Sequence, residues 1–321
     1  MTSYWKKYLL RHSLYGYARD SLLFFVNLFV WSQERDLRDV AIFNISFLLF
    51  HTLMFIITLP LLKRGFGNLL MRIGIVGLGL LLVFILLLSE STVDHLVLLG
   101  TLLGISNGLY WFVNHVESFD IANNANRASF FSLRVASQGS VKLAVPLVGW
   151  IMFTIFGNNT AGYNAIFAAS LLATLAALIL TDVRVQKESG VHIRESHREF
   201  KKTKFLYLQM LSSFAYGASY RSALATVLLP FLVFQVVETE SSLSFIQALF
   251  QILAILAALY FARFKKNMDY ITRLIVVGGI CLTVGILLLI VQLSITTYVL
   301  YAILYLIAMS TSTIGLSVMS N

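Results

Sequence analysis

Charged residues are scarce in this chain: Asp, Glu, Lys and Arg make up 12% of its 321 residues, whereas 58% are hydrophobic. Soluble domains carry about 25% charged residues, so this composition has too little charge to cover a water-facing surface. The chain also has a single cysteine, Cys281, which lies within an apolar run. One thiol cannot build an intrachain disulfide framework or a thiolate metal site, and both are excluded.

Motifs of catalysis are lacking as well. The sequence contains no His-Glu-x-x-His zinc motif and no Gly-Lys-Ser/Thr phosphate loop. We therefore expect a protein that is not an enzyme and that holds no cofactor and no metal ion.

The chain has long apolar runs from end to end instead. Each is about twenty residues long, enough to cross about 30 Å of hydrocarbon as a helix. No alternating pattern typical of barrel strands is present, and backbone groups in lipid must be satisfied internally. The predicted fold class is therefore all-α, a polytopic transmembrane protein with about ten helices. The predicted spans are residues 9–31, 40–62, 69–88, 96–116, 128–156, 163–181, 205–236, 243–262, 274–292 and 298–318.

Basic residues gather in alternate connections between these runs. They occupy the N-terminus (Lys6, Lys7 and Arg11), the loop after the second span, the polar segment 183–204 and the loop after the eighth span. The intervening loops are acidic or neutral, which places the N-terminus and the segment 183–204 in the cytoplasm. This bias also explains the net charge of +9, so we expect no nucleic-acid partner. The predicted location is the plasma membrane of a bacterium, with the protein a monomer in the lipid bilayer.

The two parts of the chain repeat at a fixed spacing. Tyr15-Gly16 in the first span recurs as Tyr216-Gly217 in the seventh, an offset of 216 − 15 = 201 residues. Other pairs with this offset are Ser21 and Ser222, Arg72 and Arg273, and Gly77 and Gly278. Parallel repeats of six helices are an architecture of transporters, which bind substrate near the membrane midplane between the repeats.

Two short motifs add to this plan, which resembles the major facilitator superfamily. The loop LKRGFGN (residues 62–68) is similar to that family's basic, glycine-containing loop, although Lys63 replaces its acidic residue and one residue is inserted. The stretch VPLVGW (residues 145–150) is similar to the family's Gly-Pro-x-x-Gly-Gly segment, degraded at both ends. The resemblance implies a gating loop that contains Lys63, Arg64, Gly65 and Gly67.

The same resemblance implies two six-helix domains. Residues 1–182 would form the N-terminal domain, residues 183–204 a cytoplasmic central loop, and residues 205–321 a C-terminal domain with four helices present. A full member has twelve spans, so we expect this sequence to stop after the tenth, either as a fragment or as a natural truncation.

Charges in the middle of predicted spans are the leading site candidates. A charge at mid-membrane costs about 2.5–3.5 kcal/mol on insertion scales, so it faces a partner or an aqueous cavity. Arg19 lies about halfway along the first span and Arg221 at nearly the matching position of the seventh. Each guanidinium can bind a carboxylate or phosphate, so the pair predicts an anionic substrate. The alternative, that each arginine pairs with a carboxylate and holds helices together, stays open.

Asp20 is the preferred proton-coupling carboxylate. Because neighbouring residues on a helix do not face each other, we expect Arg19 and Asp20 to have separate partners. His115 and Glu117, near the cytoplasmic end of the fourth span, are further proton-coupling candidates, since histidine titrates near physiological pH. The remaining substrate-binding candidates are Asn27, Asn107, Trp111, Asn114, Lys142, Tyr216 and Tyr220.

Several of these polar residues also have a structural explanation. Asn107, Trp111 and Asn114 share one stripe of the fourth span, which predicts either a cavity wall or a polar seam between helices. His51 is expected to hydrogen-bond to another helix, and Arg134 to extend its charge toward the cytoplasmic surface. The spacing Gly104-x-x-x-Gly108 predicts a close approach of two helices.

The sequence therefore predicts a secondary transporter that moves a small anionic or amphiphilic solute by alternating access. Its partners would be this small molecule and protons or another coupling ion. Two alternatives remain: an exporter or flippase for a drug, sugar or glycolipid, with gating arginines, and a truncated homologue that does not transport.

Overall fold

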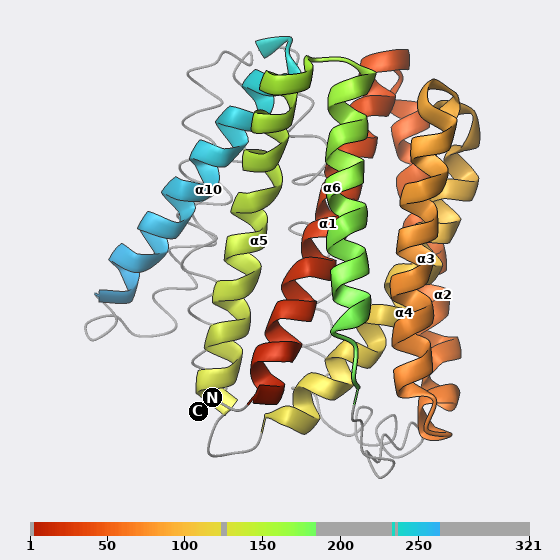
Figure 1. The fold of residues 1–321 in the computed structure, drawn as a ribbon, viewed down its shortest axis with the longest axis vertical. Helices are drawn as coiled ribbons and strands as arrows, with labels where there is room; N and C mark the ends of the chain where they lie inside the picture. The colour runs from red at the N-terminus through yellow and green to blue at the C-terminus, as the bar shows by residue number, and fades with distance from the viewer. Residues whose placement is uncertain (1–2, 123–126, 184–232, 235–236, 264–321) are drawn as a thin grey trace, which may run out of the picture. The chain divides into compact units, whose positions relative to one another are not determined.

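The structure, a computed structural model, describes residues 3–122, 127–183, 233–234 and 237–263, and its regular elements there are all helical. The elements are α1 (Ser3–Glu34), α2 (Leu37–Lys63), α3 (Gly67–Leu88), the 3-10 helix η1 (Ser89–His95), α4 (Leu96–Ile121), α5 (Arg127–Phe156), α6 (Thr160–Ile179) and α10 (Glu240–Arg263) (Figure 1). Seven predicted spans, the first six and the eighth, each coincide with one α-helix. The seventh, ninth and tenth fall almost wholly outside the described ranges, so the total number of spans stays a prediction.

Four helical segments of this part of the chain are long and apolar enough to cross a membrane. They are Leu37–Lys63, Gly67–Ile121, Ser129–Phe156 and Thr160–Ile179. Large apolar side chains on these segments point outward, with exposed fractions of 68% for Ile56, 65% for Leu80 and 84% for Ile179. An outer surface this apolar is suited to lipid rather than to water.

The described helices fall into two compact units, and each is treated by itself. One unit holds α1 up to Leu22, then α5, α6 and α10, and the other holds α1 from Leu23, then α2, α3, η1, α4 and residues 181–183. The division into domains at residues 182 and 205 stays a prediction.

Glycines bring α4 against α2 in the second unit. A methyl group placed on Gly100 would lie 2.5 Å from the carbonyl oxygen of Phe43, and one on Gly104 would lie 2.6 Å from that of Phe47. On Gly108 it would lie 2.5 Å from Cβ of Met54. The close approach predicted from Gly104 and Gly108 is therefore confirmed, and it extends one turn further to Gly100.

The loop after α2 is built to end one helix and begin the next. The backbone N–H of Gly65 donates to the carbonyl of Leu62 at 2.9 Å, and Gly65 has φ +88°, which glycine adopts without strain. Lys63 and Arg64 are exposed beside it, while Gly67 is buried at the first position of α3. The four residues predicted to form a gating loop thus form this helix connection, and their role in gating stays a prediction.

The chain that follows α6 is tied to the start of α3. Nη2 of Arg72 donates to the carbonyl oxygen of Thr181 at 3.0 Å, and the backbone N–H of Val183 donates to Oδ1 of Asn68 at 3.4 Å. Arg72, which the sequence repeat singled out, therefore binds the connection that leads from α6 into the polar middle segment.

Candidate functional site

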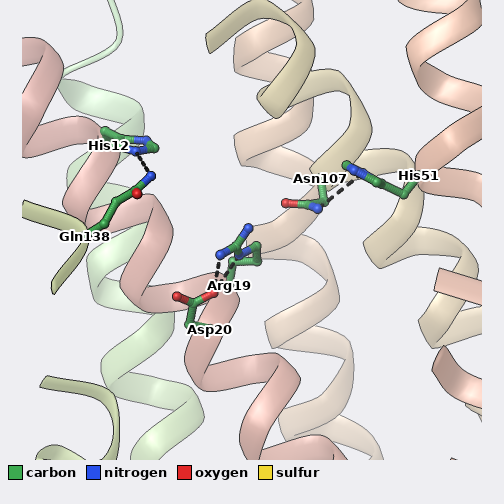
Figure 2. Close-up of polar contacts among 6 residues, drawn as sticks. All are labelled: His12, Arg19, Asp20, His51, Asn107 and Gln138. Atoms are coloured by element: carbon green, nitrogen blue, oxygen red, sulfur yellow. Dashed lines mark hydrogen bonds and ion pairs between the residues drawn. The ribbon is translucent and has the colours of Figure 1, made fainter. Parts of the chain in front are cut away.

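Arg19 and Asp20 form an ion pair at the middle of α1. Nε of Arg19 donates to Oδ1 of Asp20 at 2.7 Å, and Nη2 contacts the same oxygen (Figure 2). The expectation that the two side chains have separate partners is therefore wrong. The Arg stem is long and flexible enough to bend its guanidinium back to the neighbouring carboxylate, although the two Cβ atoms diverge.

This pair is accessible. The side chains of Arg19 and Asp20 are 22% and 27% exposed, although each lies near the centre of a helix predicted to cross the bilayer. A charged pair within a membrane protein needs either tight burial with full hydrogen bonding or access to water. The partial exposure favours access to water over tight burial.

A polar cluster on the N-terminal side of this pair along α1 joins α1 to α5 in the first unit. Nε2 of His12 lies 3.1 Å from the amide nitrogen of Gln138 (Figure 2). The hydroxyls of the adjacent residues Ser13 and Ser137 are hydrogen-bonded to each other. An amide nitrogen can only donate a hydrogen bond, so the His12 ring nitrogen accepts in this arrangement. The His12 ring also stacks on Tyr8, with centroids 5.8 Å apart.

Sequence reasoning missed this cluster and did not predict that Arg11 and Arg134 are buried. Arg11, assigned to the cytoplasmic N-terminus, is 1% exposed, and its guanidinium carbon lies 5.3 Å from the centre of the Tyr8 ring. Arg134, expected to extend toward the surface, is 7% exposed. The signal was available, because Arg134, Gln138 and Lys142 recur every fourth residue along α5, as Tyr8 and His12 do along α1.

Lys142 lies one turn beyond Gln138 on α5, and its side chain is exposed. Between these two levels Gly16 of α1 faces Val141 of α5, where an added methyl group would lie 3.7 Å from the valine. The first unit therefore holds His12 and Arg19, two turns apart on α1, and Lys142 on α5, which packs against α1.

We expect the His12–Gln138 bond to contribute about 1 kcal/mol to the stability of this helix pair. Replacing Gln138 by leucine should cost about 1–3 kcal/mol, because His12 is left buried without this bond, and replacing His12 should cost less, because Gln138 is only half-buried. The double variant should cost less than the sum of the single ones. Unfolding of all three variants in mixed detergent micelles measures this, with Ser140→Ala on the exposed side of α5 as the control. Strictly additive losses would contradict it.

Asn27 belongs to the second unit and binds a neighbouring helix. It is 4% exposed, and its Oδ1 accepts a hydrogen bond of 2.6 Å from Nδ2 of Asn44 on α2. Its own Nδ2 donates to the carbonyl of Leu23 at 2.7 Å. These bonds give Asn27 a structural task, and its predicted contact with substrate stays a prediction.

The polar stripe of α4 is hydrogen-bonded to α2 at the end near Asn107. Nδ2 of Asn107 lies 3.2 Å from Nδ1 of His51 on α2 (Figure 2), which confirms the expected interhelical bond of His51. One turn further along α4, the ring centroids of Trp111 and His115 lie 5.3 Å apart. Toward the other end His115 is exposed, whereas Asn114 and Glu117 are fully buried. The end near Asn107 is thus a seam between helices, as one of the two predictions had it.

Arg221, Tyr216 and Tyr220, the candidates from the seventh predicted span, lie outside the described residues. Whether Arg221 faces Arg19 across a cavity therefore stays a prediction, as does every assignment of these residues to a substrate. Among the described residues, no group of three His, Cys, Asp or Glu side chains could hold a metal ion.

Several long apolar helices in one chain are typical of a multi-pass membrane protein. The chain belongs to the Major Facilitator Superfamily, a family of membrane transporters, whose family model matches residues 12–321. The fold is similar to that in the crystal structure of a D-xylose-proton symporter, with a TM-score of 0.62 at 15% identity. That similarity covers 98% of this chain and 86% of the symporter.

Two bacterial relatives are similar in sequence. The uncharacterized protein YqgE of Bacillus subtilis (strain 168) is 25% identical over 280 residues, which are 87% of this chain and 64% of that protein. An uncharacterized protein in the sodM 3' region of Geobacillus stearothermophilus is 32% identical over 149 residues, 45% of this chain and 67% of the relative. The chain thus spans somewhat less than two thirds of the length of YqgE.

Proposed function

We propose that the protein is a secondary active transporter that moves a small anionic or amphiphilic solute by alternating access. The observation that carries this proposal is the partly exposed Arg19–Asp20 pair at the middle of α1. Membership of a transporter family supports the class of function, and the guanidinium supports the charge of the solute. The chain before residue 183 and the chain after residue 204 would form the two moving halves.

The pair suggests how a solute would be coupled to protons. An anionic solute that binds Arg19 must displace the Asp20 carboxylate, which already holds Nε and Nη2 of the guanidinium. Asp20 would then lack its cation at a partly buried position, where an unbalanced charge is costly. A proton on Asp20 removes that cost, so the anion and the proton would bind together and cross together.

A test uses the purified protein in proteoliposomes loaded with buffer. We expect an inward proton gradient to drive accumulation of a small carboxylate or phosphate ester, and Asp20→Asn to abolish that accumulation while exchange of labelled for unlabelled solute continues. Proton coupling through this residue would be refuted if Asp20→Asn lost both accumulation and exchange. It would also be refuted if accumulation did not depend on the proton gradient. Absence of transport for every anion tested would refute the choice of solute.

A second candidate function is export of a neutral solute such as a sugar or glycolipid. The observation that favours it is the same ion pair, because a guanidinium already bound by Asp20 is suited to hold a gate rather than a solute. Trp111, with Tyr110 in edge contact at a centroid distance of 6.1 Å, would then supply the contact surface. This candidate predicts that neutral solutes compete with anions for transport, whereas the leading proposal predicts that they do not.

A further inference from the structure

The first residues of α10 are bonded to the turn between α5 and α6. The hydroxyl of Tyr163 on α6 donates to Oε1 of Glu240, the first residue of α10, at 3.2 Å. Beside it, the backbone N–H of Ser241 donates to Oδ1 of Asn158 at 2.9 Å. Both side chains of the first pair are buried, Tyr163 at 2% and Glu240 at 8% exposure.

The receiving side of this contact is held in place by its own bonds. Asn159 caps α6, with its Oδ1 accepting from the backbone N–H groups of Ala161 at 3.0 Å and Gly162 at 3.4 Å. Gly157, at φ +89°, ends α5 with a hydrogen bond of 2.9 Å to the carbonyl of Phe153. The Phe153 ring packs edge-on against Tyr163 at 4.9 Å. These contacts orient the Tyr163 side chain without any contribution from Glu240.

The two bonds lie at the start of α10. One turn below Glu240, Phe245 meets Trp150 of α5, with ring centroids 5.4 Å apart. Farther along, α10 runs away from α5, and the two helices are clearly separated at the end that carries Arg263 (Figure 1). The end of α10 at Glu240 is thus the end at which this helix lies nearest to α5.

We propose that Tyr163–Glu240 and Asn158–Ser241 form an outer latch, a set of bonds that closes the transporter toward the outside and must break when it opens there. The proposal rests on the proposed function, because the charge pattern of the loops puts the α5–α6 turn and residues 237–239 on the outer side. The latch joins the chain before the middle polar segment to the chain after it, the two parts that alternating access has to separate. In the closed state the buried Glu240 carboxylate accepts a hydrogen bond from the Tyr163 hydroxyl. In the open state water would replace that hydroxyl.

The latch makes a graded prediction about two conservative variants. Tyr163→Phe leaves the Glu240 carboxylate buried without this donor, whereas Glu240→Gln keeps an oxygen acceptor but loses the charge. A hydrogen bond to a charged group corresponds to roughly tenfold or more in an equilibrium constant. We therefore expect the open population to rise roughly tenfold or more in Tyr163→Phe, and by less in Glu240→Gln.

Labelling of a buried cysteine measures that population. Ser244, one turn below Glu240, is fully buried, and replacement of Cys281 by serine leaves Ser244→Cys as the only thiol. In intact cells, a membrane-impermeant maleimide should label this thiol slowly in the parent and at least roughly tenfold faster in Tyr163→Phe. Glu238→Gln, which removes an exposed carboxylate two residues away, is the matched control and should label like the parent. Equal labelling rates in the parent and Tyr163→Phe would overturn the latch.

A crosslink tests the same latch from the opposite direction. Asn158→Cys with Ser241→Cys should form a disulfide on oxidation that stops transport, and a reductant should restore it. Unchanged transport in the fully crosslinked protein would overturn the latch. Labelling needs no solute, so the two proposals can fail separately: faster labelling without transport of any solute would remove the proposed function and leave the latch.

Discussion

Arg19→Ala is expected to lower the affinity for an anionic solute by roughly 10- to 100-fold, which is the effect of losing a charge-assisted hydrogen-bonded contact. The physical reason is that no other described cation of α1 lies at the middle of the helix, where Arg19 is held 22% exposed. Arg19→Lys should recover only part of the affinity, because an ammonium group lacks the planar fork of a guanidinium. Concentration dependence of solute exchange in proteoliposomes, which should continue in Asp20→Asn, measures the affinity of every variant.

Two further variants separate binding from structure. Arg19→Ala leaves Asp20 without the guanidinium that it contacts, so part of its effect could be loss of folded protein. Arg19→Ala with Asp20→Asn removes that carboxylate and should recover thermal stability without recovering affinity. Arg127→Ala, at an exposed arginine of α5, is the control and should leave uptake unchanged. If the double variant regains the parent's affinity for the anion, Arg19 holds a gate or a helix and does not bind the solute.

Gly104→Leu is expected to prevent folding of the membrane protein or to lower its melting temperature severely. Even a single methyl group at this position would lie 2.6 Å from the carbonyl oxygen of Phe47, 2.8 Å from Cβ of Phe50 and 2.9 Å from the backbone nitrogen of His51. Two of these three atoms belong to the α2 backbone, so no side-chain rotation can relieve the overlap. Overpacking of this kind costs about 1–3 kcal/mol or more, and leucine adds three further carbon atoms.

Gly139→Ala on α5 is the matched control for this prediction. No atom lies within 4 Å of a methyl group placed on Gly139, so the change adds no overlap and gains about 0.5–1 kcal/mol of helix propensity. Thermal unfolding in detergent, followed by size-exclusion chromatography, should rank Gly139→Ala at or above the parent and Gly104→Leu far below it. A Gly104→Leu variant that melts with the parent would show that α2 and α4 do not touch there.

The helices could be predicted from the sequence because the bilayer leaves the backbone few choices. An apolar run of about twenty residues in lipid must satisfy its own N–H and C=O groups, and a helix does so locally. The first six predicted spans and the eighth coincide with helices for this reason. The Gly104–Gly108 spacing was informative in the same way, since small residues four apart form a continuous groove on one helix face.

The candidate site was predictable only in part. Charge at mid-span singled out Arg19 and Asp20, because such charge is costly anywhere except at a site or a pair. Their mutual ion pair was not predictable from helix geometry, since the Arg stem has enough rotatable bonds to reach a neighbour that its Cβ does not face. His12 and Gln138 were missed because each residue by itself is unremarkable on its own helix, and only their packing makes one bond.

The sequence by itself determined that this protein is a multi-pass helical membrane protein, where its described helices run and which of them carries charge at its middle. Those properties follow from local composition, because hydropathy and backbone hydrogen bonding act within one segment at a time. Only the tertiary structure decided which side chains meet: Arg19 with Asp20, His12 with Gln138, Asn27 with Asn44 and Tyr163 with Glu240. Three of these four pairs join different helices, and the partner of a side chain across such a contact depends on the register and rotation of both helices, which neither segment specifies alone.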